Sequence, residues 1–414
     1  MEDQASESLA VHSGSEDASS VNYSKDFWSS RSELNLMHYM LKTRPFLATA
    51  ASKLTINLPD KGIVIDASGG ATAAAIGHGN KCGLYNRRRG IPRASNGFSK
   101  VYLVGSGSEA NDAVIKLASQ YFYEKGQLQR TKFISRRQAY HESTISSLSL
   151  STAASRVKQC KGILMPNTSH VGPCYPYQYR HEHETTNDYV SRLDQELEDE
   201  FQRLGPENKL SAGQLLADTR QSRTASRLFI LAEVMCGMSR TGSIFAWQDE
   251  GVVPDIFTIG KGLGAGYIPI PGMLANSRVI EAIESGSGWF NQACTFQAHP
   301  VACASALAVQ NIVKRDNLVA NSKKMGKVLE QLLTSSLAGK KYVRNIRGRG
   351  LFYAVEFAKD KETRETGTVD EKRGDHILLA PAFIMTPQDL EGIVKVIMAA
   401  YDITEQEVAA EMAL

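Results

Sequence analysis

Buried strands that lead into glycine-rich turns and helices are the feature that most constrains the fold of this chain. Residues 98–122 combine an apolar strand, a Gly/Ser turn and a helical pattern. Residues 227–234 form a continuous apolar stretch, and residues 254–267 place a second such stretch before a glycine-rich loop. Strands that are apolar throughout are covered on both faces, as in parallel sheets flanked by helices. The pattern therefore predicts an α/β domain with a mostly parallel sheet.

The C-terminal part of the sequence follows a different pattern. Pro300 opens a helical stretch that we expect to run without a break past Leu332, and residues 347–357 are predicted to form a single strand. Thr386 and Pro387 suit the N-cap and the first position of a final helix. This order of elements predicts a second, smaller α+β lobe.

Composition excludes several classes of protein. The 414 residues carry 47 Lys and Arg against 44 Asp and Glu, and the net charge of +3 is too small for an electrostatic nucleic-acid footprint. No stretch reaches the ~18 consecutive apolar residues of a membrane span, and no signal peptide or basic mitochondrial presequence is recognisable. We therefore expect a soluble cytoplasmic protein. Residues 1–21, with six serines, five acidic residues and no Lys or Arg, are expected to form a disordered tail.

The cysteines and histidines show no metal-binding pattern. His181 and His183 lie in a charged run that is typical of a solvated surface. Reduced thiols and no metal site are expected, because the six cysteines are scattered without a C-x-x-C pair or a histidine at ligand spacing: Cys82, Cys160, Cys174, Cys236, Cys294 and Cys303.

Four segments contain residue types suited to chemistry. Gly107 and Ser108 lie between a strand and a helix start, where backbone N–H groups and the helix dipole favour a phosphate, although such a turn is more often only a turn. Lys261 lies between two glycines that leave room for a group to approach its amine, and burial beside apolar walls would favour Schiff-base chemistry there. A solvated loop lysine is the alternative. Tyr140 follows a strand and offers an aromatic face to a flat cofactor, and Thr295 offers a hydroxyl to a phosphate.

In this order the four segments resemble the class III aminotransferases, which are pyridoxal-phosphate enzymes of fold type I. The most specific stretches of the resemblance are residues 232–272, 295–307 and 346–357. The resemblance implies a large domain with a mostly parallel sheet flanked by helices and a smaller α+β domain built from the chain ends. The implied boundaries are residues 22–60 for the N-terminal part of the small domain, 61–300 for the large cofactor-binding domain, and 301–414 for a linking helix and the C-terminal small domain.

The same resemblance assigns a role to each candidate residue. It implies that Lys261 binds pyridoxal phosphate covalently, that Gly107 and Ser108 hold its phosphate, and that Tyr140 covers its pyridine ring. It also implies that Thr295 reaches the phosphate of the neighbouring subunit's cofactor. The expected assembly is therefore a homodimer, with a small-molecule amino donor and an oxo-acid acceptor as substrates and with neither nucleic acid nor membrane as a partner.

Several positions depart from the family pattern. Ala232 stands where the family has an aspartate that pairs with the pyridinium nitrogen and keeps the ring an electron sink. The neighbouring Glu233 is expected to point to the opposite side of its strand. Glu142 and Ala298 replace glycines that are usual in the family.

Three segments are also shorter than in the family. They are residues 80–99, residues 208–229, where the usual strand is expected to be absent, and residues 359–373. The leading hypothesis is a pyridoxal-phosphate-dependent class III aminotransferase, or a close descendant of one, that moves an amino group between an amine or amino acid and an oxo acid; the departures above put its full activity in question. The alternatives are another pyridoxal-phosphate reaction on the same scaffold (a lyase, decarboxylase or aminomutase) or a catalytically impaired relative that acts as a binding or dimerisation partner.

Overall fold

The computed structural model describes residues 50–52, 55–58, 62–65, 97–205, 210–211, 227–358 and 375–412. The predicted tail over residues 1–21 lies outside this range. The first described strands form an antiparallel three-stranded sheet in the order β1-β2-β3, with bounds Ala50–Ser52, Thr55–Leu58 and Gly62–Ile65.

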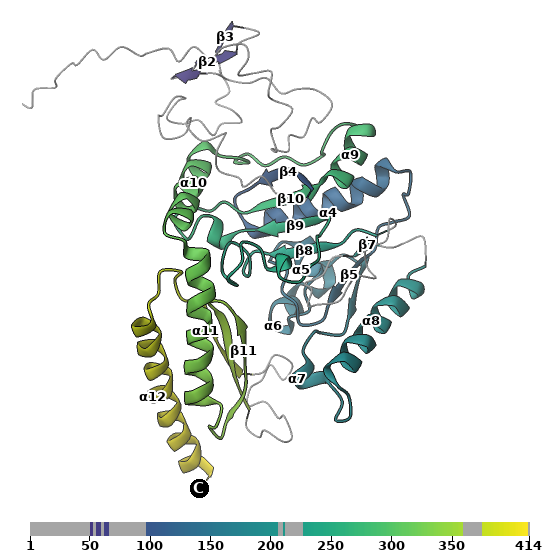
Figure 1. Cartoon of the computed structure of the whole chain (residues 1–414). Helices are drawn as coiled ribbons and strands as arrows, with labels where there is room; N and C mark the ends of the chain where they lie inside the picture. Colours follow the sequence, from purple (N-terminus) through teal and green to yellow (C-terminus); the bar gives the residue numbers. More distant parts are fainter. Residues whose placement is uncertain are drawn as a thin grey trace, which may run out of the picture. The chain divides into compact units, whose positions relative to one another are not determined.

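A four-stranded sheet in the order β4-β10-β9-β8 is the largest sheet among the described residues (Figure 1). Its strands are β4 (Phe98–Leu103), β8 (Ile230–Glu233), β9 (Ile256–Ile259) and β10 (Gly272–Asn276). β8 and β9 run parallel, with Ala232 paired to Thr258, whereas β10 is antiparallel to both of its neighbours. Because β8 and β9 are parallel, their carboxyl ends lie side by side at the same end of the sheet.

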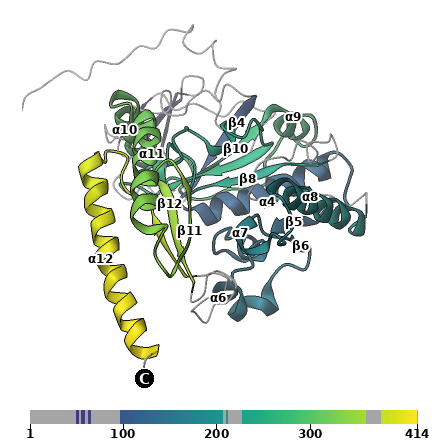
Figure 2. The same cartoon turned by 60° about the horizontal axis from the view of Figure 1, so that its bottom comes forward.

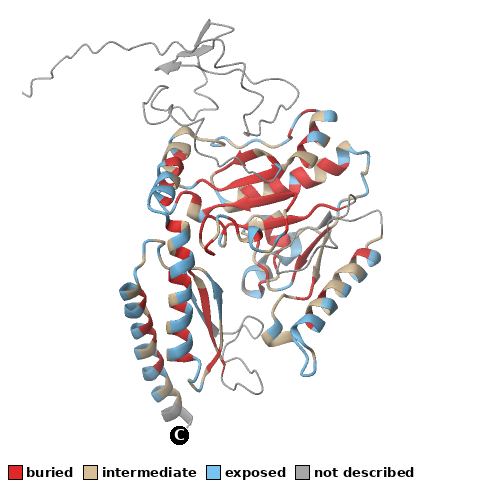
Figure 3. Ribbon diagram, viewed as in Figure 1, coloured by how far each residue is buried: buried red, intermediate tan, exposed pale blue. Residues whose placement is uncertain are grey.

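Both faces of this sheet are covered, as the apolar strands predict (Figure 3). On one face Ile230 and Ile256 pack with helices α4 (Gly107–Glu124) and α9 (Ser277–Ser285). On the other face their neighbours Leu231 and Phe257 pack with Trp247 and with small residues of α10 (Pro300–Arg315). Alternate side chains of each strand thus enter two different cores, which explains why these strands are mainly apolar.

A second sheet contains β5 (Phe133–Arg136), β6 (Thr168–Val171) and β7 (Leu210–Ser211) in the order β6-β5-β7, and all of its pairs are parallel. α8 (Thr186–Arg203) packs on it through Phe201. Within residues 208–229, where the family's usual strand is expected to be absent, β7 pairs with β5 over two residues, and residues 212–226 lie outside the described part of the chain. The combination of parallel strands with covering helices is the α/β architecture that the sequence predicts.

The C-terminal elements form a third core between helices and an antiparallel sheet (Figure 2). The elements are α11 (Leu318–Leu337), β11 (Val343–Arg349), β12 (Phe352–Phe357), β13 (Asp375–Leu379) and α12 (Pro387–Met412), with the sheet order β11-β12-β13. Thr386 Oγ1 accepts a hydrogen bond from Asp389 N at 3.3 Å, so the predicted start of the last helix is confirmed.

Two predictions about this region are wrong. The helical stretch after Pro300 is broken at Asn317, whose φ of 51° is left-handed, so α10 and α11 are separate helices. The predicted strand over residues 347–357 is a hairpin of two strands, because Gly350 turns the chain with a φ of 57°.

Short helices complete the description: α5 (Ile145–Ser149), α6 (Ala154–Val157), α7 (Pro176–Tyr179), η2 (Lys158–Ile163), η3 (Ala246–Gln248) and η4 (Lys261–Leu263). None of the described helices combines the length and the apolarity that crossing a membrane requires. Within the described residues, no group of three or more His, Cys, Asp or Glu side chains is arranged to hold a metal ion. The cysteines of the same part of the chain are free thiols.

Candidate functional site

The turn before α4, residues 105–109, is fixed by a capping box. Glu109 N donates to Ser106 Oγ at 3.1 Å, while Glu109 Oε2 accepts from Ser106 N at 3.0 Å and from Gly105 N at 2.7 Å. The N–H groups of Gly107 and Ser108 belong to the first helical turn, where no acceptor lies within the helix and the dipole favours an anion. The structure thus places both predicted phosphate residues at a helix N-terminus.

The loop that carries Tyr140 lies against this turn. Ser143 N donates to Ser108 Oγ at 3.1 Å, and the Tyr140 and Ser143 hydroxyls are hydrogen-bonded at 2.9 Å. A Cβ atom at Gly107 would lie 2.7 Å from Glu142 Oε1. Glycine therefore fits at this position as the structure stands, whereas a larger residue would require the Glu142 side chain to move. Gly107, Ser108 and Tyr140, predicted from separate motifs, are therefore brought together.

Glu142 holds a backbone conformation that favours glycine. Its φ is 80°, in the left-handed region, which agrees with its replacing a glycine of the family pattern. Because its carboxylate also packs against Gly107, a negative charge lies beside the proposed phosphate position. This carboxylate opposes binding of a phosphate at the turn.

Ala232 and Glu233 point to opposite sides of β8. The Glu233 carboxylate accepts hydrogen bonds from Ala246 N at 2.9 Å and from Trp247 N at 2.8 Å, and burial raises its pKa to about 7. Ala232 instead lines a small cavity of about 20 Å³ together with Asn111 and His141. The predicted orientation of Glu233 is confirmed, and its carboxylate does not take the place of the aspartate that Ala232 replaces.

His141 is the residue that the sequence patterns did not single out for a role. Its side chain is 4% exposed, and its Nε2 has no hydrogen-bond partner within the described part of the chain. Burial, with a smaller contribution from the nearby His170, lowers the pKa of His141 to about 4. The imidazole is therefore neutral at pH 7.

Lys261 lies two residues after the end of β9, between two glycines that are closely packed against other parts of the protein. A Cβ atom at Gly260 would lie 3.0 Å from Val234 Cγ1, and one at Gly262 would lie 2.8 Å from Met238 Cβ, so the flanking glycines allow this packing. Lys261 itself has a φ of 36° and is exposed. Of the two environments considered from the sequence, this exposure is that of a solvated loop lysine and not of an amine buried beside apolar walls.

Thr295 lies in a turn that is attached to the end of β4. Ala298 N donates to Leu103 O at 3.0 Å, and the Tyr102 hydroxyl donates to Gln297 Oε1 at 2.8 Å. Ala298 has a φ of 50°, again where a glycine is usual in the family. Thr295 is exposed, and its turn is anchored to the strand that leads into the 105–109 turn.

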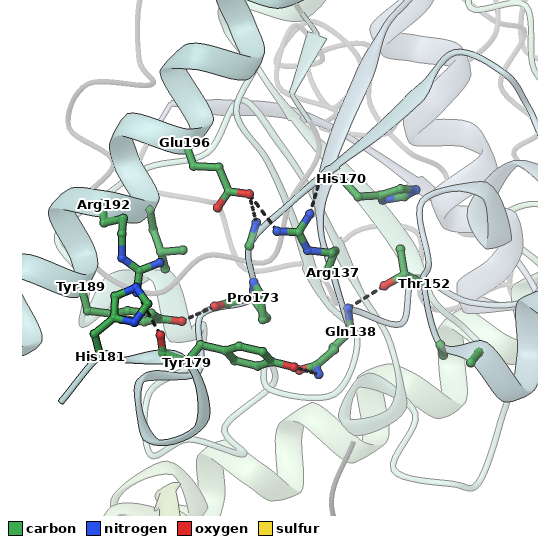
Figure 4. A pocket seen from close by; sticks show the side chains of 14 residues that line it. Arg137, Gln138, Thr152, His170, Pro173, Tyr179, His181, Tyr189, Arg192 and Glu196 are labelled. Atoms are coloured by element: carbon green, nitrogen blue, oxygen red, sulfur yellow. Dashed lines mark hydrogen bonds and ion pairs between the residues drawn. The ribbon is translucent and has the colours of Figure 1, made fainter. Parts of the chain in front are cut away.

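A separate cavity of about 420 Å³ lies at the carboxyl ends of β5 and β6 (Figure 4). Its polar side chains are paired with one another: Arg137 with Glu196 at 2.8 Å, and Gln138 with the Tyr179 hydroxyl at 2.5 Å. None of the five predicted site residues lines it. The candidate site is therefore the region around the 105–109 turn, Ala232 and Lys261.

Comparison with known proteins agrees with this arrangement. Residues 88–401 match the aminotransferase class-III family. The chain belongs to the class III aminotransferases.

An uncharacterized aminotransferase of Schizosaccharomyces pombe is 36% identical over 85% of this chain and 91% of its own length. The mitochondrial gamma aminobutyrate transaminase 1 of Solanum lycopersicum is 30% identical, over 75% of this chain and 67% of its own length. Among solved structures, the omega transaminase from Pseudomonas jessenii in complex with PMP has a TM-score of 0.72 and 27% identity, covering 88% of this chain and 94% of that one.

Class III aminotransferases use pyridoxal phosphate for amino transfer, so this cofactor and this reaction are those of the chain's family. Two features of this class III aminotransferase fit the cofactor. The Gly107 and Ser108 N–H groups lie at a helix N-terminus, and the buried His141 Nε2 offers a polar atom beside Ala232. The Glu142 carboxylate is the feature that opposes the phosphate.

Proposed function

We propose that this chain transfers an amino group between an amine or amino acid and an oxo acid, with Lys261 as the residue that binds pyridoxal phosphate covalently. The observation that carries the proposal is the position of Lys261 directly after β9. This strand is the parallel neighbour of β8, so Lys261 lies at the same sheet edge as Ala232. Bound pyridoxal phosphate supplies an aldehyde that combines with amines and a ring that withdraws electrons from the reacting carbon.

The residues of the chain divide the remaining tasks. The N–H groups of Gly107 and Ser108 bind the phosphate, and the ring of Tyr140 orients the cofactor by covering one face. With the cofactor bound, Lys261 Nζ would accept the proton of the substrate carbon that carries the nitrogen and would return it to the cofactor carbon on the other side of that nitrogen, a 1,3-proton shift. Its exposed position leaves the amine accessible to small molecules.

Borohydride reduction of the cofactor-loaded protein tests the role of Lys261. Peptide mapping should then place the pyridoxyl group on Lys261, and Lys261→Arg should abolish labelling. Lys327→Arg, at another exposed lysine, is the matched control and should leave labelling intact. A label on any lysine other than Lys261 contradicts the assignment. Amino transfer itself is measured by the absorbance change that an amino donor produces and an oxo acid reverses.

We also propose a homodimer in which Thr295 binds the phosphate of the neighbouring subunit's cofactor. The proposal is supported by the exposure of Thr295 in a turn that is hydrogen-bonded to the end of β4. Light scattering of the cofactor-loaded protein should give twice the chain mass of 45.3 kDa. An active species with the mass of one chain contradicts the shared site. A cytoplasmic location remains part of the proposal and is tested by cell fractionation.

A further inference from the structure

Two independent observations beside Ala232 indicate that a polar group could bind there. The His141 Nε2 atom is buried and lacks a hydrogen-bond partner within the described residues. The cavity that His141 shares with Ala232 has a volume of about 20 Å³, enough for a single water molecule. A buried polar atom without a partner is costly to folding, so its retention calls for an explanation.

The backbone of His141 is held independently of its imidazole. His141 N donates to Ser151 Oγ at 2.8 Å, and His141 O accepts from Asn111 Nδ2 at 3.1 Å. Asn111 lies on the first turns of α4, the helix whose N-terminus carries Gly107 and Ser108. The backbone of His141 is therefore attached to the helix that follows the 105–109 turn, and this attachment needs no hydrogen bond at Nε2.

We propose that His141 replaces the missing carboxylate as the partner of the pyridine nitrogen of pyridoxal phosphate, reached across the cavity beside Ala232. This inference rests on the proposed function, because it assumes the cofactor is bound with its ring over Ala232. The neutral imidazole donates Nε2–H, directly or through one water molecule, to the lone pair of an unprotonated ring nitrogen. Glu233 is excluded from this role because its carboxylate accepts two backbone hydrogen bonds on the other face of β8.

A neutral donor has a different effect from an aspartate. An adjacent negative charge favours a protonated ring nitrogen, whereas a neutral N–H donor favours the unprotonated form. The cofactor would then stay bound while its ring withdraws electrons less strongly. Alanine in place of the family's aspartate at position 232 would thus lower the electron withdrawal of the ring, while His141 would remain as a hydrogen-bond partner of the ring nitrogen.

The experiment follows the ring nitrogen directly. Pyridoxal phosphate labelled with ¹⁵N in the ring is bound to the wild-type protein, and its ¹⁵N chemical shift is recorded together with the visible absorption band. The expected signal is that of an unprotonated, hydrogen-bonded pyridine. His141→Phe should move it toward a pyridine without a hydrogen bond and weaken cofactor binding about fivefold, as loss of a neutral hydrogen bond predicts. His141→Asn, which keeps a donor, should recover part of both changes.

Two further variants separate the possible outcomes. His170→Phe changes a histidine that lines the other cavity and should leave the ¹⁵N signal unchanged. Ala232→Asp should shift the signal to that of a pyridinium and tighten cofactor binding about tenfold. A pyridinium signal in the wild type, or the same signal in the wild type and His141→Phe, overturns the role of His141. If the wild-type protein shows no absorption band for bound cofactor, the proposed function itself is overturned. This outcome differs from failure of the His141 role, in which the band is present and the ¹⁵N signal does not depend on His141.

Discussion

Gly350, at the turn between β11 and β12, is a position where an added methyl group would meet both an unfavourable backbone conformation and nearby backbone atoms. Its φ of 57° is left-handed, and a Cβ atom there would lie 2.7 Å from Arg240 O and 2.7 Å from Gly242 N. Both of these are backbone atoms, so neither can swing aside. The same contact contains hydrogen bonds from Leu351 N to Arg240 O at 3.0 Å and from Arg240 Nη1 to Leu351 O at 3.2 Å.

Gly350→Ala should therefore lower the free energy of unfolding by about 3–5 kcal/mol, which combines the left-handed conformation, the overpacking and the weakened hydrogen bonds. Urea unfolding at 25 °C followed by circular dichroism measures the change. Gly97→Ala is the control for conformation alone, because φ is 84° with no atom within 4 Å of the added Cβ, and it should cost about 1 kcal/mol. Gly392→Ala, with open space inside α12, should stabilise by about 0.5–1 kcal/mol. A loss in Gly350→Ala no larger than in Gly97→Ala would refute the reasoning.

Three further predictions concern the candidate site and its surroundings. Glu142→Gln and Glu142→Gly should both tighten binding of pyridoxal phosphate, measured by absorbance titration, because each removes the carboxylate beside Gly107; equal affinity in the wild type and Glu142→Gln contradicts this. Ala298→Gly should raise the free energy of unfolding by about 1 kcal/mol through relief of its left-handed conformation, and unchanged urea midpoints would count against that strain. The raised pKa of Glu233, about 7, means that the folded state retains a proton which the unfolded state loses near pH 4.5. Its contribution to stability is therefore present below pH 4.5 and is lost as the pH rises through 7, by about 3 kcal/mol in total. Glu233→Gln should remove this dependence, so unfolding curves of equal pH dependence in both proteins would show that the proton is not held there.

The sequence predicts the central sheet well because its signals are local and strong. The apolar runs around Ile230 and Ile256 have a single good solution, which is burial between two layers. The helix breaks were harder to predict. Apolar residues continue at helical spacing across Asn317, and Gly350 lies between two stretches that both favour strands. Both breaks depend on left-handed backbone conformations, which the spacing of apolar residues does not reveal. β7 is two residues long and exists only as a partner of β5.

The candidate site shows the same division between local and spatial information. Gly107 and Lys261 could be proposed from sequence because each lies in a short motif that resembles the family pattern, and their roles stay predictions. His141 could not, since its significance depends on a cavity formed with Ala232, a residue on a different strand. Likewise, the position of the Glu142 carboxylate against Gly107 follows from the packing of a loop on a helix and not from any spacing.

Gln310 makes α10 a mechanical link between two parts of the candidate site. Its side-chain amide donates to Gly262 O at 3.1 Å and to Leu263 O at 3.0 Å, so the helix is attached to the segment that contains Lys261. The same helix begins at Pro300, a few residues after the turn that carries Thr295. A shift of α10 along its axis would therefore displace the segment of Lys261 and the turn of Thr295 together. Gln310 lies roughly three helical turns from the N-terminus of α10. Substitutions that bend or extend the helix between Pro300 and Gln310 would therefore affect function through the position of Lys261.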